Sequence, residues 1–550
     1  MHRGNLYNKN ASFSMRNWIM EIKITDIPLA LGDEEKKLPA AAADILGISM
    51  EAISHVKILR KSLDARRNRP PCFVYAVVVD LPDSIDIPNI QDSRVTVGSE
   101  TPVVKETGKP LRRIEKRPVI VGSGPAGLFA SLVLARAGVP VLLIERGKPV
   151  PERLRDVQDF WIRGHFHPES HVHFGEGGAG TFSDGKLTSR GKNPRTAWVR
   201  KIFVEMGAPA DILIEAKPHI GTDQLRKVVV QMRKNLQSLG CEVRFGAKMT
   251  DLIVHDGVIS GLVINGREEI ETGHILLAIG QSADDSYRVL HKNGIRLVPK
   301  PFAAGLRIEH PQALINEIQY GPWAGHPELP PAEYVLTARI PSIDRSVYTF
   351  CMCPGGQVIG CSAMEKGVIT NGMSNSRRDG PFANSAVVVN IRIEDFAGES
   401  HDPLSGLRFR RCWEEAAYAL GGGNYYAPVQ RLTDFLCGRF STGKLNTSFL
   451  PGVTSAYLDR VLPGFAVEAL KQGLFIFNNK MPGFISGEAV LIGVETRTSS
   501  PVRILRGEDG QSASVRGIFP CGEGAGYAGG IVSSALDGIR AAEMLLRSLP

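Results

Sequence analysis

The sequence predicts an α/β protein that folds in three parts. A strand, a glycine-rich turn, a helix and a second strand follow one another in residues 118–145, as in an alternating parallel sheet. Residues 515–549 repeat the order of strand, glycine turn and helix at the other end of the chain. Between about 295 and 490 the pattern changes to short strands and Pro-Gly turns with few clear helices. We therefore expect a cofactor domain in two segments, an inserted mixed α+β domain between them, and a small α+β domain in front.

Residues 118–145 carry a dinucleotide-binding fingerprint together with the strand and helix that it requires. Val119–Val121 is a short apolar strand, 128–137 has the pattern of a helix, and 141–144 is the next strand. The glycines of the G-x-G-x-x-G turn permit the tight turn, close approach of a pyrophosphate and packing of helix on strand. Glu145 ends the second strand, where a carboxylate can accept the ribose hydroxyls of an adenosine. The pattern predicts a Rossmann-like domain. The residues expected to contact the cofactor here are Gly122, Ser123, Gly124, Pro125, Ala126, Gly127, Glu145 and Arg146.

The C-terminal segment supplies the second half of the predicted site. Residues 517–538 have the pattern of a strand, an acidic glycine turn and a glycine pair that opens a helix. Glu523 is placed to bind a ribityl hydroxyl, and the N–H groups at the helix start would face the pyrimidine edge of a flavin, which is negative when reduced. Because two such turns span both halves of a flavin dinucleotide, the sequence favours FAD over NAD as the resident cofactor. The residues expected here are Gly522, Glu523, Gly529, Gly530 and Ile531.

The middle of the cofactor domain adds further contacts. Residues 240–254 and 258–264 have the pattern of strands in a small meander, and 271–280 that of a buried strand ending in a small-residue turn. The loop 175–187 is rich in glycine, which lets its backbone approach a ligand closely, although a surface loop is the alternative. Lys186 could reach a phosphate or the flavin from this loop. The residues expected to contact the cofactor are Gly177, Gly178, Gly180, Thr181, Lys186, Leu187, Lys248, Ala278 and Gly280.

Several stretches of the chain carry a family resemblance. They are 175–187, 305–311, 350–356, 371–374, 384–385 and 493–501. The two glycine turns together resemble the glutathione-reductase-type FAD fold, in the branch with one Rossmann fingerprint and an inserted substrate domain. Across nearly its whole length the chain more closely resembles a bacterial family of uncharacterised FAD-dependent dehydrogenases. This resemblance implies FAD binding, an oxidoreductase role and a ferredoxin-like fold for the small N-terminal domain, but it implies no substrate.

Three residues are candidates for chemistry. Glu495 and Arg497 lie two apart on a predicted strand and so share one face, where they could orient an anionic substrate or supply an acid. The alternative for these two is a cross-strand ion pair. His173 ends a run of four histidines that begins at residue 165, and this run could form a surface loop, donate a proton beside the flavin or bind a metal. Because no carboxylate or cysteine pattern completes a ligand set, no metal site is expected.

Two further pairs of residues leave alternatives open. The C-x-C spacing of Cys351 and Cys353 would place both thiols on one face of a strand, as a reactive pair or as buried thiols in a reducing cytosol. Arg377 and Arg378 are a candidate anion clamp or part of a solvated loop. The eight cysteines contain no C-x-x-C motif, so a redox disulfide of the thioredoxin-reductase type is not expected.

Charge and hydropathy narrow the choice of partners. The formal net charge of +8 is small for 550 residues and suits an anionic dinucleotide as well as a nucleic acid. No window of about 18 consecutive apolar residues occurs, so no transmembrane helix and no membrane contact are expected. We expect a cytoplasmic protein that acts on a small-molecule substrate. A nucleic-acid partner is not favoured, although a basic cluster in the N-terminal domain is either a solvated loop or an RNA contact. The members of this cluster are Arg60, Lys61, Arg66, Arg67 and Arg69.

These patterns predict how the chain divides into domains. The expected organisation is a tail at 1–19, a small α+β domain at 20–85, a linker at 86–115, an FAD-binding domain at 116–294 and 491–550, and an inserted substrate or lid domain at 295–490. We expect an FAD-dependent oxidoreductase that passes a hydride through flavin N5 between NAD(P)H, or the substrate itself, and a small-molecule acceptor. No second G-x-G-x-x-G occurs in a strand–helix context, so any NAD(P)H would be a transient electron donor. The alternatives are a flavin-dependent RNA-modifying enzyme and a non-catalytic flavin-binding protein.

Overall fold

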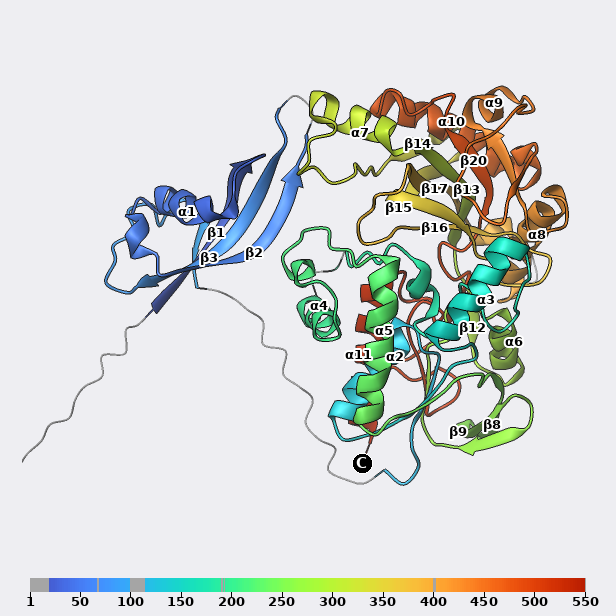
Figure 1. Cartoon of the computed structure of the whole chain (residues 1–550). Helices are drawn as coiled ribbons and strands as arrows, with labels where there is room; N and C mark the ends of the chain where they lie inside the picture. Colours follow the sequence, from blue (N-terminus) through green and yellow to red (C-terminus); the bar gives the residue numbers. More distant parts are fainter. Residues whose placement is uncertain are drawn as a thin grey trace, which may run out of the picture. The chain divides into compact units, whose positions relative to one another are not determined.

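The computed structural model describes residues 19–66, 69–98, 114–188, 191, 193–398 and 402–549 (Figure 1). The chain divides into two compact units, Met1–Val103 with Ile214–Ala216, and Val104–Leu213 with Lys217–Pro550. All of the predicted tail except residue 19 lies outside the described residues. The same is true of Arg67 in the basic cluster and of residues 99–113 in the predicted linker.

The small N-terminal unit is a four-stranded antiparallel sheet with one α-helix packed on it. Its strands follow the order β2-β3-β1-β4. Alternate residues of a strand point to the same face, and Val77, Val79 and Leu81 of β3 are buried together with Leu38 and Leu46 of the helix. The elements are β1 (Ile19–Ala30), α1 (Leu38–Leu46), β2 (His55–Asp64), β3 (Cys72–Pro82) and β4 (Val95–Val97).

The strand order is that of a ferredoxin-like sheet, but the expected fold is incomplete. Residues 83–94, between β3 and β4, contain no α-helix, so the second helix of a ferredoxin-like domain is missing from this described segment. β4 lies inside the predicted linker 86–115 and pairs with β1, so the unit extends beyond the predicted boundary at residue 85. A strand of three residues is too short for its alternation to stand out in the sequence.

The described cations of the basic cluster are largely paired. Arg66 and Arg69 both contact the carboxylate of Asp64, at 2.6 and 2.5 Å, and Lys61 contacts Glu35 at 2.9 Å. Because Arg66 and Arg69 share one carboxylate, their cluster keeps one positive charge in excess. The choice between a solvated loop and an RNA contact stays a prediction.

The cofactor domain is built on a five-stranded parallel sheet in the order β22-β11-β5-β6-β7. Two strands from the middle of this domain and one from the C-terminal segment complete the sheet that the two strands of the fingerprint begin. Four of the strands are buried on both faces, as is typical of parallel sheets, and the edge strand β7 is half-buried. The strands of the sheet are β5 (Val119–Val121), β6 (Leu142–Ile144), β7 (Glu242–Arg244), β11 (Ile275–Leu277) and β22 (Ile518–Pro520).

Helices from both segments cover this sheet. α2 (Pro125–Arg136), α5 (Thr222–Ser238) and α11 (Ile531–Ser548) lie side by side in Figure 1. α11 packs closely on α2 because a Cβ on Gly538 would meet the carbonyl oxygen of Ala126 at 2.1 Å. The remaining elements of the domain are α3 (Val150–Arg163), α4 (Arg195–Glu205), α6 (Asp284–Lys292) and the meander β8 (Met249–His255), β9 (Val258–Ile264) and β10 (Glu268–Glu271).

The insertion is a mixed α+β domain around an eight-stranded sheet. Its strand order is β14-β15-β17-β13-β20-β18-β19, with β16 paired to β15. β20 belongs to this sheet, so the insertion runs past its predicted end at residue 490. The strands are β13 (Phe302–Pro311), β14 (Thr337–Ile340), β15 (Arg345–Gly360), β16 (Thr370–Met373), β17 (Phe382–Ile391), β18 (Ala427–Arg431), β19 (Val453–Ser455) and β20 (Val490–Glu495).

Helices of the insertion are more prominent than the sequence pattern indicates. They are α7 (Gln312–Tyr320), α8 (Ser405–Leu420), α9 (Leu432–Cys437) and α10 (Gly464–Lys480). Two short paired strands, β12 (Leu297–Pro299) and β21 (Val502–Ile504), mark where the chain leaves and re-enters the cofactor domain. Within the described parts of the chain, no helix combines the length and the apolar character needed to cross a membrane.

Candidate functional site

A cavity of about 400 Å³ opens where the carboxyl ends of the parallel strands meet the inserted domain. Ligands of open α/β sheets bind at this edge. The turn after β5, the loop 178–188, the turn 278–283 and the turn after β22 form most of its lining. Phe350, Cys351 and Asn371 line it from the inserted domain, and Glu495, Arg497 and Thr498 from the end of β20.

Two positions in the lining of this cavity require glycine, because another stretch of backbone approaches each of them closely. Gly122 has φ +103°, and a Cβ there would lie 2.4 Å from the carbonyl oxygen of Ala278. Gly178, in the short helical turn Gly178–Phe182, also has positive φ, and its Cβ would lie 3.1 Å from the Cα of Gly124. Gly124 is the N-cap of α2, so the N-terminus of that helix and the loop together present backbone N–H groups to the cavity.

Glu145 is buried and its carboxylate is already fully engaged. Oε2 accepts hydrogen bonds from the N–H and the hydroxyl of Ser123, at 2.9 and 2.8 Å, and Oε1 accepts from the N–H groups of Gly147 and Gly175, both at 2.9 Å. These four donors use the acceptor capacity of a carboxylate. Glu145 therefore ties the fingerprint turn to the loop at Gly175, and a ribose hydroxyl has to take the place of one donor, of which the Ser123 hydroxyl can rotate away.

Arg146 and Lys248 line the cavity within a compact charge cluster. Arg146 contacts Glu169 at 2.7 Å and Asp285 at 2.8 Å, and Lys248 contacts the same two carboxylates at 2.9 and 2.6 Å. Burial raises the pKa of Asp285, but Arg146 and Lys248 lower it by much more, so its carboxyl stays ionised. The guanidinium of Arg146 also lies 3.9 Å from the ring centre of Phe174. Two cations and two anions thus form a balanced polar wall.

The second glycine turn brings a carboxyl group to the cavity. Burial raises the pKa of Glu523 to about 7, against the opposing effect of Lys300. Oε1 of Glu523 accepts a hydrogen bond of 3.0 Å from Gln281, whose own Oε1 has no hydrogen-bond partner among the described residues. A Cβ on Gly522 would lie 2.8 Å from that of Ala126, so the two glycine turns are in direct contact.

Most of the residues predicted to contact the cofactor line this one cavity. They are Gly122, Gly124, Pro125, Ala126, Glu145, Arg146, Gly178, Gly180, Lys186, Lys248, Ala278, Gly280, Gly522, Glu523, Gly529, Gly530 and Ile531. Ser123, Gly127, Gly177, Thr181 and Leu187 do not line it. Ser123 is bonded to Glu145, Gly127 packs α2 on the turn, the Thr181 hydroxyl donates to Glu176, and Leu187 is in the core.

Glu495 and Arg497 both line the cavity, but they are not paired with each other. β20 ends at Glu495, so Arg497 does not share a strand face with it, contrary to the expectation. Glu495 contacts Arg307 at 3.3 Å and accepts a hydrogen bond from Thr370 at 3.1 Å. Burial raises the pKa of Glu495, and Arg307 only partly offsets this. Arg497 makes a bidentate contact with Glu414, with Nη2 2.9 Å from Oε2.

The four histidines divide into two pairs. His165 and His167 lie 3.3 and 3.2 Å from Asp159, whereas His171 and His173 are embedded near the cavity. Burial holds the pKa of His173 well below its usual range, so this imidazole is neutral. His173 lines the cavity, and its Nε2 has no hydrogen-bond partner among the described residues. Across those residues no group of three or more His, Cys, Asp and Glu side chains could hold a metal ion.

The expectation that Cys351 and Cys353 share one face is wrong. Cys351 has φ +50°, and the pairing of β15 with β17 shifts between Phe350 and Cys353, so the alternation of side chains is broken there. Cys351 is exposed and lines the cavity, whereas Cys353 is buried. Burial raises the pKa of Cys353 to about 11.

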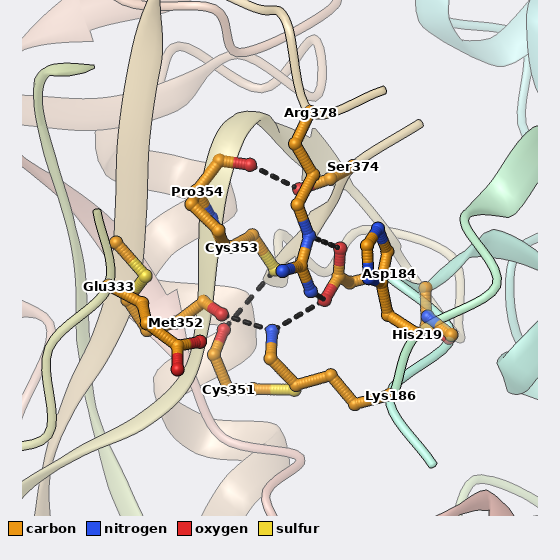
Figure 2. A network of polar contacts seen from close by, with 12 residues as sticks. Asp184, Lys186, His219, Glu333, Cys351, Met352, Cys353, Pro354, Ser374 and Arg378 are labelled. Carbon is orange, nitrogen blue, oxygen red and sulfur yellow. Dashed lines mark hydrogen bonds and ion pairs between the residues drawn. The ribbon is translucent and has the colours of Figure 1, made fainter. Parts of the chain in front are cut away.

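A network that sequence reasoning missed joins the loop 178–188 to the inserted domain (Figure 2). The carboxylate of Asp184 accepts two hydrogen bonds from Arg378, at 3.1 and 2.5 Å. Lys186 Nζ donates to Asp184 at 2.6 Å and to the carbonyl of Met352. Burial raises the pKa of Asp184, but the two cations lower it to about 2. Arg378 is therefore a buried structural cation, while Arg377 is exposed.

Further cavity residues were not predicted because nothing in their local sequence marks them. Gln281 and Ser282 follow the small-residue turn at Gly280, and a buried polar pair after such a turn is the signal that could have found them. The hydroxyl of Ser282, like Gln281 Oε1, has no hydrogen-bond partner among the described residues. Buried polar atoms of this kind take their partners from a bound ligand or from ordered water. Glycine-lined backbone, a helix N-terminus and unpartnered polar atoms fit a flavin dinucleotide along the cavity.

Comparison with known proteins agrees with this assignment. Residues 116–155 match an FAD binding domain, 301–498 match the C-terminal domain of FAD-dependent proteins, and 21–80 match a domain of unknown function. A protein of Clostridium beijerinckii, described as uncharacterized, is 43% identical over 530 residues, which cover 96% of this chain and 99% of the relative.

Solved structures resemble the chain more distantly. CtdE in complex with FAD is 12% identical, with 79% of this chain and 85% of that chain covered and a TM-score of 0.31. A geranylgeranyl bacteriochlorophyll reductase-like protein from Thermoplasma acidophilum is 12% identical, with 78% of each chain covered and a TM-score of 0.34. Such low scores say nothing about the reaction. The 43% identity over almost the whole length does decide the family: the chain belongs, with its Clostridium relative, to a family of FAD-dependent proteins, and its cofactor is FAD.

Proposed function

We propose that this protein is an oxidoreductase that moves a hydride between NAD(P)H, or the substrate itself, and a small-molecule acceptor. One observation supports the proposal above the others: the glycine turns of the cofactor domain and the ionisable residues of the inserted domain line the same cavity. Bound FAD supplies hydride transfer at its N5 atom. The protein would supply the substrate site and the proton. The glutathione-reductase type of the FAD fold stays a prediction.

Glu495 is the residue that we assign to proton transfer. A carboxyl group whose pKa is raised by burial holds a proton closer to neutral pH than an exposed one. Arg307 and Thr370 contact its two oxygens and fix its orientation. His173 is neutral at this pH and would act through hydrogen bonds, while Arg497, held by Glu414, would anchor the substrate.

The test is an anaerobic titration of the purified yellow protein, followed by the visible absorbance of its flavin. We expect NADH, NADPH or one fraction of a metabolite pool to bleach the flavin. Glu495→Gln should slow turnover by about 10²–10⁴-fold, because it removes the proton donor. The variant also loses the charge that pairs with Arg307, so its stability and FAD content are measured alongside turnover. A flavin that dithionite alone reduces would instead identify a non-catalytic flavin-binding protein.

A further inference from the structure

We propose that the substrate of this cavity is a small organic carboxylate, held by Lys186 from the cofactor domain and Arg497 from the end of β20. This inference rests on the proposed function, since it names the substrate class of the same site. Two cationic groups that line one cavity and have hydrogen-bonding capacity to spare carry it, together with an excess positive charge in the cluster of Lys186, Arg378 and Asp184.

Lys186 presents a charged ammonium to the cavity. Its side chain is 27% exposed, and Nζ has two acceptors among the described residues, Asp184 and the carbonyl of Met352. An ammonium group has three donors, so one is left for a ligand. Burial lowers the pKa of Lys186, but its charged surroundings, the Asp184 carboxylate among them, raise it by more, which keeps the group charged. Figure 2 shows these residues around Nζ.

Arg497 lines the same cavity and has an unsatisfied donor. Only 8% of the residue is exposed, and Glu414 occupies Nε and Nη2. Nη1 has no hydrogen-bond partner in the described part of the chain, and it lies 3.6 Å from a carboxylate oxygen of Asp284. A buried N–H group of a guanidinium that lacks an acceptor is unfavourable, and a carboxylate would supply that acceptor.

The charges around this wall do not cancel. Lys186 and Arg378 share a single carboxylate, Asp184, so this cluster has one positive charge in excess. The ion-paired groups behind this cluster balance one another; they are Arg307, Arg410 and Arg497 against Glu495, Asp284 and Glu414. The carboxyl groups of Glu145 and Glu523 also line the cavity, but they belong to the turns that hold the cofactor. Protonation of Glu495 would add to the excess. An anionic substrate neutralises it, whereas a neutral or cationic substrate leaves a buried charge uncompensated.

The FAD pyrophosphate is the competing source of negative charge. The turn at Gly124 and the N-terminus of α2 already offer it backbone N–H groups and a helix dipole. The two sources separate experimentally, because a substrate anion must still bind when the protein is saturated with FAD.

Cys351 provides a reporter for this charge, since its exposed thiol lines the same cavity near Lys186. The FAD-saturated protein is alkylated in parallel with iodoacetate, an anion, and iodoacetamide, its neutral analogue, and each cysteine is followed by peptide mass. The exposed Cys412 and Cys437 lie outside the cavity lining and serve as references in the same chain.

We expect the iodoacetate-to-iodoacetamide rate ratio to be about tenfold higher at Cys351 than at the reference thiols. Acetate or succinate at constant ionic strength should protect Cys351 from iodoacetamide, whereas acetamide should not. Lys186→Met should remove both effects, and Lys186→Arg, which keeps the charge, should retain them. A wild-type ratio equal to the references, or protection seen only without FAD, would overturn the proposal. Alkylation rates do not depend on turnover, so this experiment tests the substrate class separately from hydride transfer.

Discussion

Arg307 of β13 and Glu495 at the end of β20 form an ion pair of 3.3 Å in which both side chains are buried. Arg307 also donates to Asn384 at 3.0 Å and to the carbonyl of Cys351 at 2.8 Å. The pair and its partners thus link four strands of the inserted sheet, β13, β15, β17 and β20.

Replacing one member of the Arg307–Glu495 pair should lower the free energy of unfolding far more than replacing both. Arg307→Met leaves an uncompensated carboxyl group and is expected to lower the free energy of unfolding by about 3–5 kcal/mol. Adding Glu495→Gln should restore part of the loss. Urea unfolding of the two single variants and the double variant gives the coupling. Simple additivity of the two single effects would contradict a coupled buried pair.

Loss of one hydrogen-bond donor to Glu145 should lower the free energy of unfolding less than loss of the carboxylate charge does. Ser123→Ala removes one of four donors and is expected to cost about 1 kcal/mol. Glu145→Gln turns an acceptor oxygen into a donor that faces backbone N–H groups, and about 3 kcal/mol should be lost together with FAD retention. Chemical unfolding and the flavin content of the purified variants measure both. Equal costs for the two substitutions would show that the carboxylate does not organise this turn.

Two glycines, one inside α2 and one just after its end, should separate effects on FAD binding from effects on stability. A Cβ on Gly127 would lie 1.9 Å from the carbonyl oxygen of Gly122, so Gly127→Ala should push α2 off the turn and weaken FAD binding by at least about tenfold. Gly138 has φ +81° and nothing within 4 Å of its Cβ position. Gly138→Ala should therefore lower stability by about 1–2 kcal/mol with unchanged FAD affinity. Flavin fluorescence titration distinguishes the two, and equal affinities would refute the role of Gly127.

His310 should make stability fall in mild acid. Burial lowers its pKa from 6.5 to about 4, while Nε2 bonds the carbonyl of Phe484 at 2.8 Å. The unfolded chain then binds the proton first, so stability is full above pH 6.5 and is lost as pH falls toward 4. This group alone should remove about 3 kcal/mol.

His310→Gln, which keeps an N–H donor for Phe484, should flatten this pH dependence relative to the wild type. Urea unfolding at pH 7, 5.5 and 4.5 on both proteins provides the comparison. Parallel curves for the two proteins would mean that His310 does not titrate in this range.

Local requirements explain why so much of the cofactor site could be predicted. The glycine turns at Gly122 and Gly522 need positive φ and close approach within a few residues, and such needs leave a direct trace in the sequence. The polar wall is different, because Asp184 and Arg378 are 194 positions apart and Arg307 and Glu495 are 188 apart. Pairings at that separation depend on how strands of the insertion align. The irregular backbone at Cys351 likewise follows from the pairing of β15 with β17, which no local spacing encodes.

The order of the sheet also decides when the protein can take up its cofactor. β22 is the last strand made, yet it pairs directly with β11, and the helix that carries Ile531 follows it. During synthesis, the whole inserted domain leaves the ribosome before β22 and α11 do. A growing chain therefore holds the fingerprint turn long before it holds the turn at Gly522, and the edge of β11 stays open meanwhile. Loading with FAD is accordingly an event of the finished polypeptide, and chains truncated before residue 531 should accumulate without flavin.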